Sequence, residues 1–254
     1  MRLDPEAHGD VQKRLGKPLV LILDEYDAPP RKLTISLLRS FRSALSLADD
    51  SRPFVHAIVL CGKTHVRDLR DELRPTGEET RGSGSLWNVA LPIALSNLSE
   101  VELDQLIADY VRESGVVLTR EVRDELWRKT RGQPWLVSRI LYQIDQQLGT
   151  PRPDPQQPQS QPGPTEAEVR SLCNQLLSED CVHLLSVGDA VKDRREAQEL
   201  LLRLLAGEEV RFDRCDEVQS YLLDVGLVTA TDSGQNIEIA NPIYEAYLLR
   251  VLGD

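Results

Sequence analysis

The chain has 254 residues, of which 41% are apolar and 28% are charged, a composition typical of globular proteins and sufficient for about two compact units. No apolar run approaches the ~20 residues of a membrane-spanning helix, and the opening MRLDPEAHGD lacks the basic and apolar regions of a signal peptide. We therefore expect a soluble, cytoplasmic protein. The four cysteines are scattered, without a CxxC pair or clustered histidines, so we expect buried thiols rather than a zinc site or disulfides.

The net charge of −11 is distributed unevenly along the chain. Residues 1–164 carry 23 acidic and 22 basic side chains, whereas residues 165–254 carry 18 acidic and 8 basic side chains, a net of −10. A surface that neutralises phosphates needs the opposite sign. The charge therefore argues against nonspecific nucleic-acid binding by the C-terminal region.

The N-terminal region has the pattern of an α/β sheet. The apolar run PLVLIL at 18–23 predicts a parallel strand that is covered on both faces, and VHAIVLC at 55–61 predicts a second one. Between them, apolar residues recur with helical period over 32–47, so strand, helix and strand predict a right-handed crossover. A weaker third strand is expected at 87–94.

From Ser99 onward the pattern predicts helices only. Ser99 and Glu102 form a capping box, a second helix is expected from Thr119, and Gly132-Gln133-Pro134 interrupts the chain before a third helix. These helices predict a small helical lid.

A linker and a last domain complete the chain. Residues 149–164 hold six prolines and four glutamines among sixteen residues, which predicts an extended linker. After it, helices are expected around 166–177, 194–206 and 213–223, followed by a short hairpin with a turn at Asp232-Ser233-Gly234. Helices that lead into a hairpin suggest a winged helix.

The strongest chemical signal is the run LVLILDE at 19–25, which has the form of a Walker B strand. Paired acids at the carboxyl end of a buried parallel strand lie where α/β sheets bind ligands. In this interpretation Asp24 helps to hold Mg²⁺ and Glu25 orients the attacking water. A buried strand that enters a solvated turn can also end in acids without any such role.

The chain lacks the phosphate-binding loop G-x-x-x-x-G-K-[ST], whose glycines let backbone N–H groups surround the phosphates. Gly62-Lys63-Thr64 matches the end of that motif. The earlier glycine would fall at Ala57, however, and residues 58–61 have the pattern of a strand. We therefore reject this segment as a phosphate-binding loop.

Several segments, in order, resemble the bacterial AAA-like ATP-binding proteins that are grouped with STAND-type P-loop NTPases. GQPWLV, within the segment at 131–137, and IANPIY are the most specific of them. The matching segments are GKPLVLILDEYD at 16–27, VLCG at 59–62 with VRDLR at 66–70, GSGS at 82–85 with Trp87-Asn88, Leu98-Ser99, RGQPWLV at 131–137, YLLDVGLV at 221–228 and IANPIY at 239–244.

The resemblance implies a fold, a cofactor and site residues. It implies a helix-rich α/β architecture with a partial nucleotide-binding domain at 1–98, the lid at 99–148, the linker at 149–164 and a winged-helix-like domain at 165–254. It implies ATP or ADP with Mg²⁺ as cofactors. The implied site comprises Asp24 and Glu25 of Walker B, Thr64 and Arg67 of the sensor-1 region near the γ-phosphate, and Gly132 and Pro134 of a GxP motif near adenine.

The implied activity is nucleotide-dependent switching, with one departure from the family. In the family the phosphate-binding loop precedes the Walker B strand, and this chain has only eighteen residues before Leu19. We therefore expect absent or very weak hydrolysis by this chain alone, nucleotide binding if the missing segment is supplied, and protein partners. A non-catalytic interaction module, a winged-helix DNA-binding regulator and one part of a split or truncated protein remain alternatives, and the oligomeric state stays open.

Overall fold

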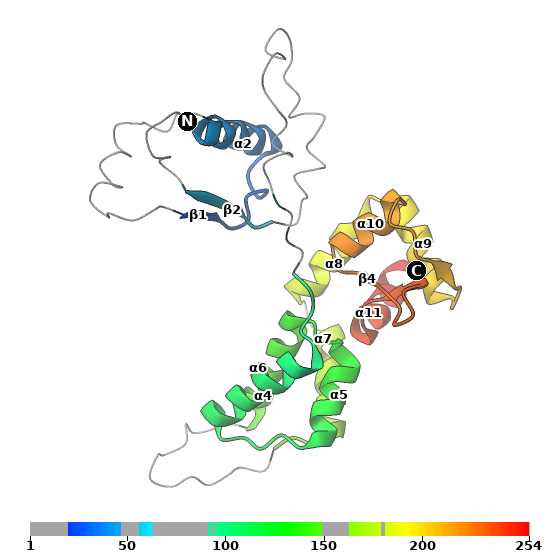
Figure 1. Ribbon diagram of the computed structural model, residues 1–254. Helices are drawn as coiled ribbons and strands as arrows, with labels where there is room; N and C mark the ends of the chain where they lie inside the picture. Colours follow the sequence, from blue (N-terminus) through cyan, green and yellow to red (C-terminus); the bar gives the residue numbers. More distant parts are fainter. Residues whose placement is uncertain are drawn as a thin grey trace, which may run out of the picture. The chain divides into compact units, whose positions relative to one another are not determined.

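The computed structural model describes residues 20–46, 56–62, 91, 93, 95–148, 163–178 and 181–253, and the observations below concern these residues. They form a helix-rich α/β protein with one parallel and one antiparallel sheet (Figure 1). The chain divides into two compact units, Met1–Ile93 and Ala94–Asp254. None of the described helices is both long and apolar enough to cross a membrane.

The described part of the first unit consists of two strands and one helix. β1 (Val20–Leu23) pairs in parallel with β2 (Ala57–Leu60), and α2 (Arg31–Ser46) connects them in sequence, as the apolar pattern predicted. On one face of the sheet, Leu23 and Leu60 pack against a cluster of two buried side chains, Leu38 of α2 and Tyr26. This contact is the small core of the described part of the unit.

The opposite face of the β1–β2 sheet is exposed. Val20 and Ile22 of β1 are 47% and 70% exposed, and Val59 of β2 is 41% exposed. The expectation of a strand covered on both faces is therefore wrong for this face. An apolar run specifies a strand that can be buried, but it does not specify an element to cover each face.

The third predicted strand at 87–94 is described only at Leu91 and Ile93. Neither residue lies in a strand, and both side chains are largely exposed. Pro92 between them has no N–H group to donate to a sheet. The expected strand is therefore absent at these two residues, and the rest of the segment lies outside the described residues.

The second unit contains eight described helices and a three-stranded sheet. The strands are antiparallel, in the order β3-β5-β4. The elements are α4 (Glu100–Ser114), α5 (Arg120–Thr130), α6 (Pro134–Leu148), α7 (Glu166–Ser178), α8 (Val182–Lys192), α9 (Arg195–Leu205), β3 (Val210–Arg211), α10 (Glu217–Asp224), β4 (Val228–Ala230), β5 (Asn236–Ile239) and α11 (Pro242–Leu252).

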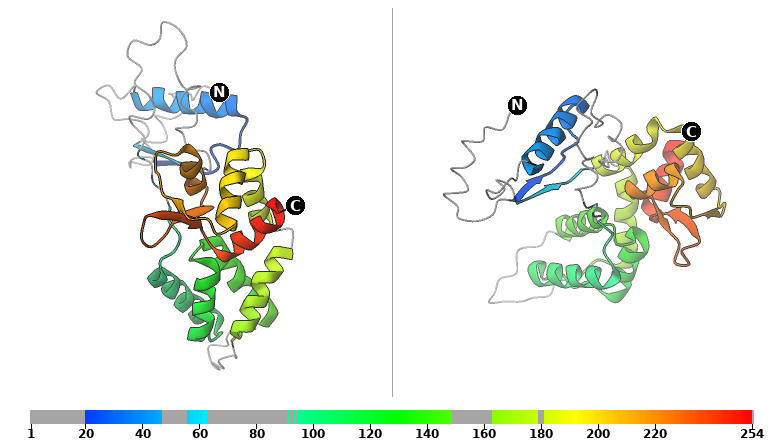
Figure 2. Two further views of the ribbon diagram at one scale, coloured as in Figure 1. Left: turned by 90° about the vertical axis from the view of Figure 1, so that its right-hand side faces the viewer. Right: turned by 45° about the horizontal axis from the view of Figure 1, so that its top comes forward.

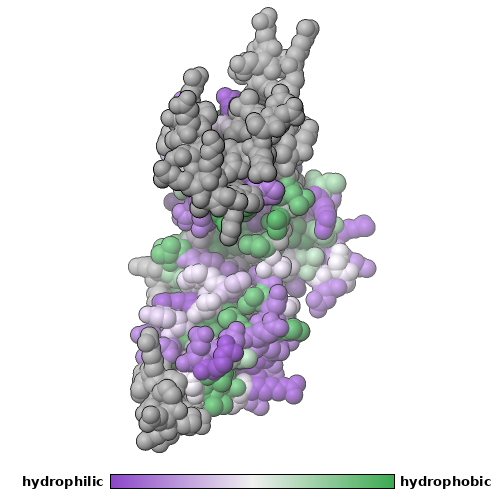
Figure 3. Space-filling view, turned by 60° about the vertical axis from the view of Figure 1, so that its left-hand side comes forward, coloured by the Kyte–Doolittle hydropathy of each residue, from purple (hydrophilic) through white to green (hydrophobic). Residues whose placement is uncertain are grey.

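One hydrophobic core runs through this second unit. Helix α11 packs against α5, α7, α8 and α9, so helices from before and after residues 149–162 share the same core (Figure 2). Fully buried side chains come from both groups, including Leu126 of α5, Ile140 of α6 and Leu248 of α11. Other apolar side chains reach the surface as separate patches among polar ones (Figure 3).

The cysteines occupy different environments. Cys173 and Cys181 are buried, as expected, and burial raises the pKa of the Cys173 thiol to about 11. Cys61 is partly buried, and Cys215 is exposed, contrary to the expectation for these residues. Cys215 follows Arg214 in a turn with no apolar period, so the sequence around it carries no burial signal.

Two helices begin with capping boxes. At α4, the Ser99 N–H donates to Glu102 Oε2 at 2.7 Å and the Glu102 N–H donates to Ser99 Oγ at 3.3 Å. Thr165 and Glu168 form the same pair of bonds at the start of α7, at 2.7 and 3.3 Å. In each box, the backbone N–H and then the hydroxyl of the first residue lower the pKa of the glutamate.

We expect this pKa shift to make stability fall in acid. A lowered folded-state pKa contributes stability above the ordinary glutamate pKa of about 4.3, and that contribution is lost as the pH falls through the folded value. The double variant Glu102→Gln/Glu168→Gln should therefore melt below the wild type at pH 7 and converge with it below about pH 4. Thermal melts from pH 7 to pH 3 measure the difference, and Glu113→Gln, outside both boxes, is the control. A constant difference would contradict the role of ionisation.

Candidate functional site

The carboxyl ends of β1 and β2 lie at the same edge of the sheet because the two strands are parallel. Asp24 and Glu25 follow β1, and Cys61 and Gly62 follow β2. The Cys61 N–H donates to the Leu23 carbonyl at 2.8 Å. The Tyr26 N–H in turn donates to the Cys61 carbonyl at 3.1 Å. These bonds fix the turn after β1 against the end of β2.

The turn itself holds Glu25 in an unusual conformation. Its φ is +50°, in the left-handed region, which costs about 1–2 kcal/mol for a residue other than glycine. The Glu25 N–H donates to Asp24 Oδ1 at 3.0 Å, and the Glu25 carbonyl accepts from the Ala28 N–H at 2.9 Å. Both carboxyl side chains are exposed. The turn therefore presents two carboxylates to solvent at the ligand-binding edge of a parallel sheet.

Gly62 packs closely against this turn. A Cβ atom at position 62 would lie 2.6 Å from Asp27 Oδ1 and 2.7 Å from the ring of Tyr26, which is buried. A side chain here would displace the turn that carries the carboxylates. Residues Ala57–Leu60 form β2, which agrees with the rejection of Gly62-Lys63-Thr64 as a phosphate-binding loop. Thr64 and Arg67 lie outside the described residues.

The second predicted site segment, Gly132 to Pro134, forms a close turn between α5 and α6. Gly132 has a φ of +72°, and its carbonyl accepts from the Leu98 N–H at 2.8 Å. Gln133 Oε1 accepts from the Leu136 N–H at 2.6 Å, and the exposed Pro134 is the first residue of α6. Gly132 is buried and hydrogen-bonded to Leu98. The turn therefore has a structural role as the start of α6.

The structure brings residues of the GQPWLV and IANPIY segments to a common neighbour, His183. Trp135 stacks on His183 of α8, with ring centroids 4.5 Å apart and planes 12° apart, and His183 Nε2 lies 2.7 Å from the Tyr244 hydroxyl of α11. Trp135 is 37% exposed, so its ring stays partly accessible to solvent. No local pattern in the sequence indicates His183 as a contact residue, since its partners are 48 and 61 positions away.

Burial, and to a smaller extent Cys181, raises the pKa of Tyr244 above its usual value. Its phenol therefore stays neutral at physiological pH and shares one hydrogen bond with the imidazole. Asn241 caps α11, since its Oδ1 accepts from the Tyr244 N–H at 2.9 Å. The Trp135–His183–Tyr244 contact thus links α6, α8 and α11.

The described residues contain no cluster of three or more histidine, cysteine or acidic side chains that could hold a metal ion by themselves. Asp24 still has one carboxylate oxygen that is not used in the turn. Mg²⁺ is commonly held by one or two carboxylates together with phosphate oxygens and water. The residues present therefore fit a magnesium ion that arrives with a phosphate ligand.

No protein-family model and no curated protein matches the sequence. Among solved structures, the chain is similar to the Aeropyrum pernix ORC2 protein, which was determined as ADPNP–ADP complexes. The identity is 14% and the TM-score is 0.39, over 98% of this chain and 69% of that chain. This likeness is too distant to support a residue role, and none of the roles below depends on it.

Proposed function

We propose that this chain is part of an ATP-dependent switch in which Asp24 and Glu25 have the Walker B roles. The observation that carries the proposal is the parallel pairing of β1 and β2, which places two exposed carboxylates directly beside the end of the neighbouring strand. Nucleotide-binding α/β sheets bind their ligands at this edge.

The proposed roles follow from the chemistry of the side chains. The free oxygen of Asp24 would hold Mg²⁺ together with the nucleotide phosphates, and Glu25 would orient water. A bound magnesium ion would neutralise part of the negative charge of the phosphates. By the family resemblance, Thr64 and Arg67 would sense the γ-phosphate, and the Gly132–Pro134 turn would lie on the adenine side.

We also infer a winged-helix-like arrangement for the C-terminal part of the second unit. Its support is the order of elements, in which α8, α9 and α10 precede the β4–β5 pair of the antiparallel sheet. The Trp135–His183–Tyr244 contact would couple the Gly132–Pro134 turn to these helices, because Trp135 directly follows Pro134. A ligand at the turn could then bias the position of α8 and α11.

Weak, magnesium-dependent nucleotide binding that requires Asp24 is the expected result of the direct test. Without a G-x-x-x-x-G-K-[ST] segment, much of the usual phosphate contact is missing, so we expect a Kd of about 0.1–1 mM for Mg-ATP. Asp24→Ala should weaken binding about tenfold or more, because it removes the cation ligand. Glu25→Gln should leave binding nearly unchanged, since glutamine can still accept a hydrogen bond. Calorimetric titration with Mg-ATP and Mg-ADP measures the Kd of the wild type and of both variants.

The control for this experiment is Asp232→Ala, which removes an exposed carboxylate from a turn of the second unit. Binding that is equally weakened by this variant, or unaffected by Asp24→Ala, would contradict the Walker B assignment. A folded protein that binds neither nucleotide in the presence or absence of Mg²⁺ would contradict the proposed function for this chain.

A non-catalytic interaction module is the second candidate function. It is favoured by the exposed apolar face of the β1–β2 sheet, where Val20, Ile22 and Val59 reach the surface. The two candidates make different predictions for single substitutions. If Ile22→Ser changes sedimentation of the chain while Asp24→Ala changes nothing and no nucleotide binds, the interaction module is the better explanation.

A further inference from the structure

Helix α2 of the first unit carries only positive charge. Its 16 residues include no acidic side chain and four basic ones, which are Arg31, Lys32, Arg39 and Arg42. The two units also differ in total charge: residues 1–93 carry 14 basic and 13 acidic side chains, and residues 94–254 carry 16 basic and 28 acidic ones. The charge that argues against binding of phosphates therefore belongs to the second unit.

The inward side of α2 is already used within the first unit. Thr34, Leu38 and Phe41 follow one another at spacings of four and three residues, and all three are buried. Leu38 belongs to the small core that the helix forms with the sheet (Figure 1). An interfacial helix enters lipid with its apolar side, which α2 does not have available. Leu33 is exposed, but one apolar side chain is too little to anchor a helix in a membrane.

The outward side of α2 is basic and carries hydroxyl groups. Lys32, Ser36 and Arg39 lie four and three residues apart, so they share one face of the helix, and all three are exposed. We call these three residues the basic face of α2. Next to it, Ser40 Oγ donates to the Ser36 carbonyl at 3.0 Å. Lysine, arginine and serine side chains are typical donors to the phosphate oxygens of nucleic acids.

Carboxylates near α2 do not account for its charge. Asp24, Glu25 and Asp27 lie in the turn before the helix, but no carboxylate of the described residues pairs with Lys32. Arg31 and Lys32 also occupy the first turn, where the positive end of the helix macrodipole favours acidic side chains. Basic residues at this end therefore do not serve the stability of the helix, which is consistent with a role in binding an anion.

Duplex DNA fits the basic face better than single-stranded nucleic acid or duplex RNA. Single strands are commonly held by exposed aromatic side chains, and the one aromatic residue of α2, Phe41, is buried. A helix enters the wide major groove of B-form DNA, whereas the major groove of RNA is deep and narrow. With a rise of 1.5 Å per residue, Lys32 and Arg39 lie about 10 Å apart along the axis, close to the length of three base pairs.

We propose that the first unit binds the phosphate backbone of duplex DNA through the basic face of α2. Lys32 and Arg39 would approach phosphate oxygens, and the Ser36 hydroxyl would donate a hydrogen bond to one of them. Because phosphate contacts carry no sequence information, this binding does not depend on the base sequence. It requires no ATP, so its test is independent of the Walker B assignment.

The test is fluorescence anisotropy of the full chain, without nucleotide, on two labelled duplexes of unrelated sequence. At 50 mM salt we expect a Kd of about 10–100 µM that differs less than about twofold between the duplexes. Lys32→Gln/Arg39→Gln should weaken binding about tenfold. It should also reduce the slope of log K against log salt concentration by about 2, because each lost phosphate contact removes about one. The charge-conserving variant Lys32→Arg/Arg39→Lys should keep the affinity within about twofold.

Arg211→Gln/Arg214→Gln is the matched control, because it removes the same charge from two exposed positions of the second unit. It should change the affinity less than about twofold. Equal losses in the two glutamine double variants would overturn the proposal, since total charge rather than α2 would then determine binding. Tighter binding of a single strand, or no binding of either duplex, would also overturn it. So would binding of phosphatidylserine vesicles, but not of DNA, that depends on Lys32 and Arg39, because a membrane would then be the partner.

Discussion

Replacing Gly132 with alanine should lower the free energy of unfolding of the second unit by about 2–5 kcal/mol. The backbone at Gly132 has a φ of +72°, which costs an alanine about 1–2 kcal/mol. In addition, the new Cβ would lie 2.0 Å from the Leu98 carbonyl oxygen and 2.9 Å from the Trp127 ring. Removing this overlap would separate Leu98 from the turn and weaken the 2.8 Å bond between them.

Urea denaturation followed by circular dichroism measures this loss, and Gly234→Ala is its matched control. Gly234 has nearly the same φ, +67°, but no atom lies within 4 Å of the position of its Cβ. Its substitution should cost only about 1 kcal/mol, the conformational part of the effect. Equal losses in the two variants would show that the contact with Leu98 contributes nothing.

Local patterns in the sequence predicted the local structure of this protein. Ser99 with Glu102 marks the start of α4, and Gly132 to Pro134 separates α5 from α6, as expected. The apolar runs at 18–23 and 55–61 gave the parallel strands β1 and β2. These features depend on bonds or side chains a few positions apart, so a single sequence contains the information.

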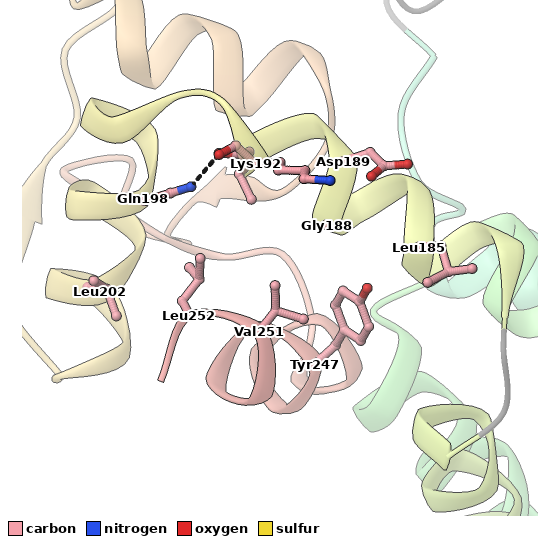
Figure 4. A pocket seen from close by; sticks show the side chains of 10 residues that line it. Leu185, Gly188, Asp189, Lys192, Gln198, Leu202, Tyr247, Val251 and Leu252 are labelled. Carbon is pink, nitrogen blue, oxygen red and sulfur yellow. Dashed lines mark hydrogen bonds between the residues drawn. The ribbon is translucent and has the colours of Figure 1, made fainter. Parts of the chain in front are cut away.

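The parts of the structure that the sequence did not predict depend on distant neighbours. Exposure of Ile22 is a consequence of what packs on the sheet, which the apolar run does not encode. The contact of His183 with Trp135 and Tyr244 joins three helices, and the pocket lined by Leu185, Leu202 and Val251 takes residues from α8, α9 and α11 (Figure 4). At the candidate site, the sequence identified Asp24 and Glu25 but not the left-handed turn that presents them.

Glu125 of α5 shows a further long-range relation, because its carboxylate is buried between two arginines. Its side chain is only 2% exposed, and it accepts from Arg128 Nε at 2.7 Å and from Arg170 Nε of α7 at 3.3 Å. The two arginine side chains are 53% and 47% exposed. The ion pair between Glu125 and Arg170 therefore joins α5, before residues 149–162, to α7, after them. Of the three side chains, only the Glu125 carboxylate is removed from water.

This asymmetry determines which substitution is the more damaging. In Arg128→Ala/Arg170→Ala, the carboxylate stays buried without its partners, and we expect a loss of about 3–5 kcal/mol. In Glu125→Gln the arginines remain in contact with water and the amide oxygen still accepts a hydrogen bond, so the loss should be only about 1 kcal/mol.

Urea denaturation compares both variants with Arg112→Ala, which breaks the exposed pair with Asp109 and should cost less than about 1 kcal/mol. If removing the two arginines lowers the free energy of unfolding no more than Glu125→Gln does, water reaches the carboxylate in the variant. Burial of Glu125 would then not determine the loss of stability. If the order is as expected, the connection between α5 and α7 depends on the two arginines that neutralise Glu125.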